Sequence, residues 1–115
     1  MHNTVEKTTS QALLKLGIAP NTKGYRYLLK AVDVYSGNTD ISVNFSKMLY
    51  PEIAGLYNKS SISVERAIRS AIHNGYANRD VNFADSVFGN TLQGKNDIPT
   101  NTLFVSALTE WIKRQ

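Results

Sequence analysis

Five polar side chains recur along residues 61–75 at spacings that would place them on one side of a helix. They are Glu65, Arg66, Arg69, Ser70 and His73. Arginine can form two hydrogen bonds with guanine, glutamate can accept one from cytosine, and serine or histidine can donate to bases or phosphates. This set has the chemistry needed to recognise base edges in a DNA groove. Alternatively, it is a solvated helix face on which Glu65 and Arg69 form a stabilising i, i+4 pair.

An apolar pattern with helical period predicts the element that carries these side chains. Its members, spaced i, i+3, i+4, i+7 and i+8, are Val64, Ala67, Ile68, Ala71 and Ile72. A shorter pattern of the same kind comes before it at Ile53, Ala54 and Tyr57. The spacing fits a helix-turn-helix at about 47–76, with its second helix from about Ser61 to Gly75. Asn58 falls where the turn requires a positive φ, which asparagine tolerates better than most residues.

Composition limits the class of protein. A chain of 115 residues is long enough for one domain with a core. It has no cysteine, and it has neither an apolar run of about 18 residues nor a signal-peptide core. We therefore expect a cytoplasmic protein without membrane association. The net charge is +4, and five basic but only two acidic residues lie between positions 47 and 79, which would attract a phosphate backbone.

Residues that could form a catalytic centre are lacking. The two histidines are His2, near the N-terminus, and His73, on the predicted outer helix face. The carboxylates are scattered, and no metal-binding, nucleotide-binding or triad motif occurs. We expect no enzymatic activity, no catalytic residues, no metal site and no cofactor.

Runs of residues along almost the whole chain resemble one family of DNA-binding domains. They are KGYRYLLKAV at 23–32, KMLYPEIA at 47–54, LYPEIAGLYN at 49–58, VERAIRSAI at 64–72, VFG at 87–89 and PTN at 99–101. The family is the effector domain of the sporulation initiation response regulator, the stage-zero A factor of spore-forming Firmicutes. The resemblance extends from about Val5 to the C-terminus. It implies an all-α, six-helix bundle that contains a helix-turn-helix and is winged-helix-like without a clear wing.

The resemblance and the outer-face pattern together give a set of candidate DNA contacts. The predicted base-reading residues are Glu65, Arg66, Arg69 and Ser70. The predicted contacts to the DNA backbone are Lys59, Ser60, Ser61, His73 and Lys95. Ser70 stands where the family has a histidine, so its shorter side chain reaches less far. The resemblance implies double-stranded DNA as partner, entered through the major groove at a box of TCGAC-like bases, with tandem or dimeric copies side by side.

Several features of the sequence have more than one interpretation. The family's intact regulators carry a phosphorylatable receiver domain that this sequence lacks, so residues 1–115 are either an excised effector domain or a stand-alone relative. The segment near 80–89 resembles the part of the family that lies by the RNA polymerase sigma subunit, where Phe83 could serve the contact or the core. Val87 and Phe88 are expected in the core. The alternative function is a helical protein-interaction module that contacts sigma factor or a partner regulator without reading DNA.

Capping residues and apolar spacing predict the remaining helices. Residues 1–8 are expected to be frayed. A short helix would run from Thr9 or Ser10 to Leu16, with Gly17 as its stop. Further helices are predicted at about 22–35, at 41–49 with a cap at 38–40, at 82–88 with Asn82 as N-cap, and from Thr100 or Asn101 to Arg114. Pro51 either lies in the first turn of a new helix or forms a kink in one long helix, and the family resemblance implies that the helix continues through it. Apolar spacing predicts the inward stripes, which are Tyr25, Leu28, Leu29, Val32 and Tyr35 in the helix at 22–35, Phe45, Met48, Leu49, Ile53 and Tyr57 around Pro51, and Leu103, Phe104, Ala107, Leu108, Trp111 and Ile112 in the last helix. Residues 91–98 read as a loop.

Overall fold

The fold is all-α, as the sequence predicts. The computed structural model describes residues 2–37, 45–89 and 97–115. Its helices are α1 (His2–Lys15), α2 (Lys23–Ser36), α3 (Phe45–Tyr57), α4 (Ser61–Gly75), α5 (Val81–Phe88) and α6 (Asn101–Lys113), with a 3-10 turn, η2 (Tyr76–Asn78). Within these ranges there is no strand, so the described chain is a six-helix bundle without a wing.

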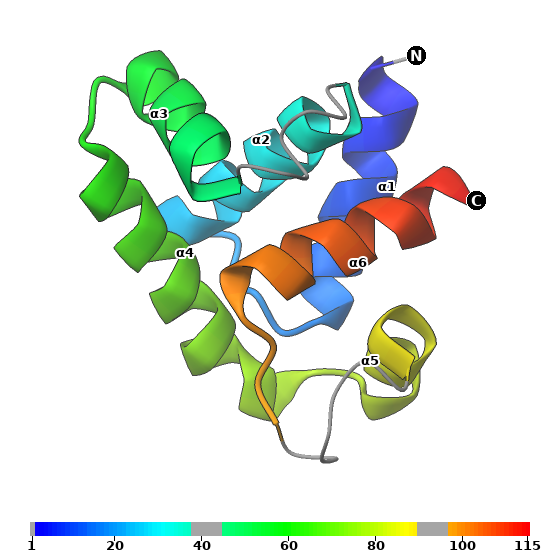
Figure 1. Ribbon diagram of the computed structural model, residues 1–115. Helices are drawn as coiled ribbons and strands as arrows, with labels where there is room; N and C mark the ends of the chain where they lie inside the picture. The colour runs from blue at the N-terminus through cyan, green and yellow to red at the C-terminus, as the bar shows by residue number, and fades with distance from the viewer. Residues whose placement is uncertain (1, 38–44, 90–96) are drawn as a thin grey trace.

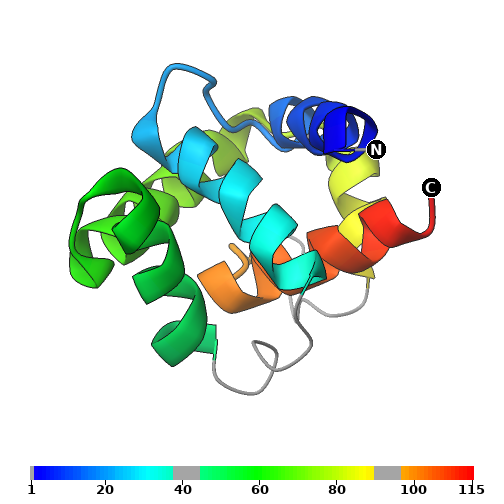
Figure 2. The ribbon, with the colours of Figure 1, turned by 90° about the horizontal axis from the view of Figure 1, so that it is seen from above.

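Helix α2 occupies the middle of the bundle. It contacts α1, α3, α4 and α6, which surround it in the view from above (Figure 2). Helix α4 lies along one side of the molecule, with α3 above it and α6 crossing the middle (Figure 1). The core forms where these helices meet, and Leu13, Leu28, Ile68 and Phe104 are fully buried there. The ends of the described chain lie on the side away from α4 in both views.

Helix α1 begins much earlier than predicted. Residues 2–8 are helical rather than frayed, so neither Thr9 nor Ser10 starts the helix. Thr9 is instead buried in mid-helix, and its hydroxyl donates to the carbonyl oxygen of Val5 at 2.8 Å. No glycine or proline interrupts this segment, so the helix continues towards the N-terminus.

The end of α1 is as predicted. Gly17 has a φ of +88°, and its N–H donates to the Leu14 carbonyl at 3.0 Å. The Ile18 N–H donates to the Leu13 carbonyl at 3.0 Å, which completes a Schellman motif. A left-handed residue therefore ends this helix, as the glycine indicated.

The other helix ends follow their capping residues, with one correction. Thr22 and Thr100 cap α2 and α6 by accepting the N–H of Tyr25 and Leu103. Asp80, not Asn82, caps α5, because its carboxylate accepts the Phe83 N–H at 3.1 Å. The Asp80 N–H also donates to a carbonyl of the α1 end at 2.7 Å, which fixes this earlier start.

Helix α3 runs through Pro51 without interruption, as the resemblance implied. Pro51 is exposed, so its ring faces solvent on the outside of the helix. The predicted start of this helix and its cap at 38–44 lie outside the described residues. Of its predicted inward stripe, Leu49 and Ile53 are fully buried, and Met48 and Tyr57 are half-buried. The side chain of Phe45, the fifth member, lies outside the described part of the structure.

The buried stripes of α2 and α6 are broader than predicted. Tyr27 and Ala31 are buried on α2, whereas the predicted Leu29 and Tyr35 are only half-buried. On α6, Val105 and Thr109 are buried although neither was predicted, and the outer members of the predicted stripe are half-buried: Leu103, Ala107, Trp111 and Ile112. The reason is that both helices contact several neighbours, so each is enclosed on more than one face.

The C-terminal end of α5 is in the core, as expected. Val87 and Phe88 are buried, and Phe88 packs on Phe104 of α6 with ring centroids 5.6 Å apart. Phe83, which the sequence left open, is half-buried and meets the Trp111 ring edge to face at 5.0 Å. Phe83 therefore contributes to the packing of α5 on α6.

Candidate nucleic-acid interface

The turn between α3 and α4 has the geometry of a helix-turn-helix. Asn58 has a φ of +55° and is the one non-glycine residue with positive φ in the described ranges. The Lys59 N–H donates to the Ala54 carbonyl at 2.9 Å and closes the end of α3. Ala54 and Val64 are both buried where the two helices meet. The left-handed residue of the turn is the one that the sequence predicted.

The inner side of α4 is fixed by close packing. Val64, Ile68 and Ile72 are fully buried against the rest of the bundle. Helix α2 approaches α4 so closely at Gly24 that a Cβ there would lie 2.5 Å from the Ala67 carbonyl oxygen. No side chain larger than hydrogen fits at this crossing without movement of α2 or α4. Helix α4 therefore rests on a rigid base.

A buried asparagine ties α4 to two other helices. Asn101, at the start of α6, is 9% exposed, and its Nδ2 donates to the Tyr50 hydroxyl at 3.0 Å and to the Glu65 carbonyl oxygen at 3.2 Å. Burial raises the pKa of the Tyr50 phenol above its ordinary value, so the hydroxyl stays protonated. The α3–α6–α4 connection through Asn101 meets α4 at Glu65, one of the predicted base-reading residues.

The opposite side of α4 carries the five polar side chains predicted to face outward. We call this the outer face of α4: Glu65, Arg66, Arg69, Ser70 and His73. Arg66, Ser70 and His73 are exposed. The side chains of Arg69 and Glu65 are 56% and 29% exposed, and Arg69 Nη1 lies 3.1 Å from Glu65 Oε2. The structure thus brings the predicted base-reading residues together on one accessible surface, with Glu65 aligning the Arg69 guanidinium.

The start of α4 presents the predicted backbone-contacting residues. Lys59 and Ser60 are exposed, and Ser61 is half-buried. The Ser60 hydroxyl oxygen accepts the Ser63 N–H at 3.1 Å, which caps α4 and leaves the Ser60 O–H proton able to donate to a phosphate. The first turn of α4 has no acidic residue, so the positive end of the helix dipole is not offset there. Lys95 lies outside the described residues.

Two grooves lie on either side of the outer face. One, of about 320 Å³, separates α4 from the start of α6 and is lined by Arg69, His73 and residues 98–102 among others. The second, of about 410 Å³, separates α4 from the start of α2 and is lined by Lys23, Ser70 and Asn74 among others. The outer face of α4 is therefore a ridge between two hollows, a shape that suits a helix entering a DNA groove.

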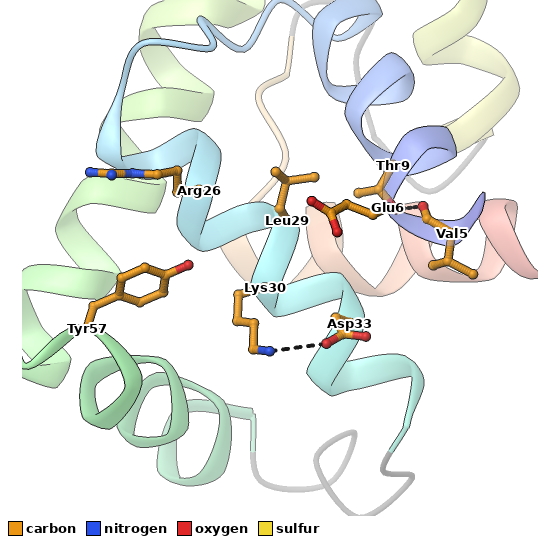
Figure 3. A pocket seen from close by; sticks show the side chains of 8 residues that line it. All are labelled: Val5, Glu6, Thr9, Arg26, Leu29, Lys30, Asp33 and Tyr57. Carbon is orange, nitrogen blue, oxygen red and sulfur yellow. Dashed lines mark hydrogen bonds and ion pairs between the residues drawn. The ribbon is translucent and has the colours of Figure 1, made fainter. Parts of the chain in front are cut away.

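A third cavity has a different character. It lies between α1, α2 and the end of α3, has a volume of about 320 Å³, and is shown with its lining side chains in Figure 3. Two acidic and two basic residues line it, and Lys30 pairs with Asp33 at 3.3 Å. No residue of the outer face of α4 lines this cavity. Its balanced charge distinguishes it from the helix-turn-helix surface.

Sequence reasoning missed two contributors to the α4 surface. Ile62 is 64% exposed on the second residue of α4, and it was passed over because only polar side chains were considered for the outer face. Its position four residues before Arg66 was the signal that could have identified it. The role of Asn101 was missed because its partners are 36 and 51 residues away in the sequence.

Neither a metal-binding cluster nor a membrane-spanning helix is found in the described part of the chain. Among those residues, no group of three or more histidines, aspartates or glutamates is arranged to hold a metal ion. None of the helices found there has the length and apolarity to cross a membrane.

The family comparison agrees with the geometry of the helix-turn-helix. The chain matches the family model of the sporulation initiation factor Spo0A C terminal over residues 9–112. The match includes all of α2 to α5 and nearly all of α6. This family consists of DNA-binding effector domains of a sporulation regulator and is a family of transcription factors, not of enzymes. The chain belongs to the Spo0A C-terminal domain family.

Proposed function

We propose that this domain binds promoter DNA in a sequence-specific manner and acts as a transcription regulator. The observation that carries the proposal is the outer face of α4, where two arginines and a glutamate project together from a rigid helix. In the proposed complex, α4 enters the major groove. The domain then acts in the cytoplasm, where its DNA lies.

The arginines have the main role in reading sequence. Arg66 and Arg69 contact guanines or adjacent phosphates. The Glu65 carboxylate, already 3.1 Å from the guanidinium, orients Arg69 or accepts a hydrogen bond from cytosine. A bidentate arginine–guanine pair discriminates against a wrong base by about 1–3 kcal/mol. Ser70 is exposed next to Arg69, but its short side chain limits it to bases close to the helix.

The backbone contacts set the register of the domain on DNA without reading sequence. We assign this role to Lys59, Ser60, Ser61, His73 and Lys95. The exposure of Lys59 and Ser60 at the start of α4 supports the assignment, as does the position of His73 in the groove beside α6.

The test begins with selection of bound sequences from random duplex DNA, followed by mobility shifts at two salt concentrations. Arg69→Ala should lose about 1–3 kcal/mol on the selected duplex and tolerate changes at one or two base pairs. Arg114→Ala removes the same charge from the end of α6 and serves as control, with little change in base preference. Failure of the selection to enrich any sequence would contradict the proposal of sequence-specific DNA binding.

Lys59→Ala separates backbone contacts from base contacts. It should weaken binding to all sequences alike and reduce the slope of log affinity against log salt by about one unit. An effect of Lys59→Ala that depends strongly on the duplex sequence would contradict its assignment to the backbone.

Contact with the RNA polymerase sigma subunit is a second proposed interaction. Val81, at the start of α5, is 54% exposed, and it lies within the segment at 80–89 that resembles the sigma-proximal part of the family. Val81→Ala should weaken association with purified sigma subunit while leaving DNA binding unchanged.

Binding of tandem copies of the domain side by side on DNA is proposed as well. Comparison of duplexes that carry one box and two boxes would distinguish independent from cooperative binding.

A further inference from the structure

Ile62 is the most exposed of the large apolar side chains in the described part of the chain, at 64%. It is the second residue of α4, directly after the exposed turn of the helix-turn-helix. Val64, two positions later, is fully buried in the core. The side chain of Ile62 is thus excluded from the core by the helix register that Val64 fixes.

Helical geometry places Ile62 among the arginines of the outer face. It precedes Arg66 by four residues and Arg69 by seven, so the three side chains follow one another along the same side of α4. Because side chains on a helix lean towards its N-terminus, Ile62 covers the surface nearest the turn. An apolar side chain therefore extends the arginine-bearing surface by one helical turn.

The chemistry of the major groove contains one apolar partner for such a side chain. Base edges there present hydrogen-bond donors and acceptors, and thymine adds a C5-methyl group. Arginines on either side attract the phosphate-lined groove, but isoleucine can neither donate nor accept a hydrogen bond. The most favourable contact of Ile62 in that groove is the burial of its side chain against a methyl group.

We propose that Ile62 reads the C5-methyl group of a thymine that neighbours the bases contacted by Arg66 and Arg69. The inference rests on the proposed function and deepens it by naming a base. It makes Ile62 a specificity-determining residue, whereas Lys59 and Ser60 at the same end of α4 contact only the backbone.

The test removes the methyl group from the DNA and the side chain from the protein in turn. In the selected duplex, each thymine is replaced singly by deoxyuridine, which lacks only the C5-methyl. For wild type, one replacement should weaken binding about fourfold, the value of one buried methyl group. Ile62→Ala should bind the unmodified duplex about fourfold or more weakly and be indifferent to deoxyuridine at that position.

Leu56→Ala is the matched control. Leu56 is 57% exposed but belongs to α3, so its loss should leave the dependence on the thymine methyl unchanged. Circular dichroism verifies that both variants keep their helices, which their surface positions favour.

Three results would overturn the proposal for Ile62. They are a wild-type affinity that no deoxyuridine replacement changes, an equal loss of affinity by Ile62→Ala on the thymine and deoxyuridine duplexes, and a selected site that has no thymine beside its guanines.

In each of these cases, the proposed function would still hold if sequence-specific binding continued to depend on Arg69. Absence of specific binding by wild type would remove both. Ile62→Ala that affects only sigma binding would assign this residue to a protein contact instead.

Discussion

Helix α4 is held by two contacts of different chemical character, one with α2 and one with α6. On one side α2 packs against it through Gly24, where the backbone of α2 is in close contact with the Ala71 methyl group and the Ala67 backbone. On the other side α6 holds it through Asn101, whose amide is shared between Tyr50 and Glu65. The first contact fixes how far α4 stands from the core. The second fixes its position along the surface, close to the base-reading residues. Substitutions that break each contact should therefore have separable effects.

Losses of similar, large size are expected at the two contacts, and Gly24→Ala tests the apolar one. Gly24→Ala would place a Cβ 2.5 Å from the Ala67 carbonyl oxygen, so α2 and α4 must separate. Overpacking of this kind costs about 1–3 kcal/mol of unfolding free energy, which urea denaturation measures. Gly37→Ala is the control, because Gly37 has a φ of −93° and a Cβ there would lie 3.7 Å from the Asp33 carbonyl oxygen, an ordinary contact distance. This variant should change stability by about 0.5 kcal/mol at most. Equal losses in the two variants would show that the α2–α4 approach is not tight.

At the polar contact, Asn101→Ala removes the buried amide that donates to the Tyr50 hydroxyl and to the Glu65 carbonyl oxygen. The expected loss is about 1–3 kcal/mol of unfolding free energy. Asn74→Ala removes an exposed asparagine of α4 and should be nearly neutral. We also expect Asn101→Ala to reduce base selectivity at the positions read by Arg69. The reason is that Glu65 accepts the hydrogen bond of Asn101 through its carbonyl oxygen and pairs with Arg69 through its carboxylate. Unchanged stability would mean that the hydrogen bonds of Asn101 contribute nothing net.

Alkaline pH gives a third test of the polar contact. Burial raises the pKa of Tyr50 above 10.0, the value expected in the unfolded chain. Below pH 10 the phenol is neutral in both states, and above it the unfolded state loses the proton first. Folding stability should therefore fall as pH rises from 10 through the raised pKa.

Tyr50→Phe should reduce this alkaline loss of stability, measured by thermal unfolding at a series of pH values. Some loss should remain, because burial also raises the pKa of Tyr76. A wild-type stability that is constant above pH 10 would contradict the burial of both phenols.

The smallest effect is expected in the turn, away from both contacts. Asn58 has a φ of +55°, which glycine adopts without strain. Asn58→Gly should raise the unfolding free energy by a few tenths of a kcal/mol, or leave it unchanged, and Asn58→Ala should lower it by about 1 kcal/mol. Greater stability of the alanine variant would mean that this turn does not need a left-handed residue.

The same two contacts show what the sequence could predict. Local signals sufficed for the helix-turn-helix, because Asn58 and the apolar spacing of α4 act within a few residues. The early start of α1 was missed, because the buried Thr9 resembles an N-cap in the sequence alone. The cap of α5 was misplaced by two residues for a similar reason, since Asp80 is selected partly by its backbone contact with α1.

The same distinction between local signals and distant contacts applies to the candidate site. Five outer-face residues follow from helical period alone, and the structure exposes each at least in part. Gly24 and Asn101 hold α4 through contacts with distant segments, which no local pattern reveals. The helical spacing alone also places Ile62 on the outer face. It was missed because only polar side chains were considered there.

The proposed function depends most on the entry of α4 into the major groove with its arginines on guanine. The direct measurement replaces each guanine of the selected duplex singly by 7-deazaguanine, which lacks the N7 acceptor in that groove. Wild type should lose affinity at one or two positions by about 1 kcal/mol or more, and Arg69→Ala or Arg66→Ala should be insensitive at the position that each contacts. Indifference of wild type at every guanine, or the same loss in all three proteins, would contradict the claim.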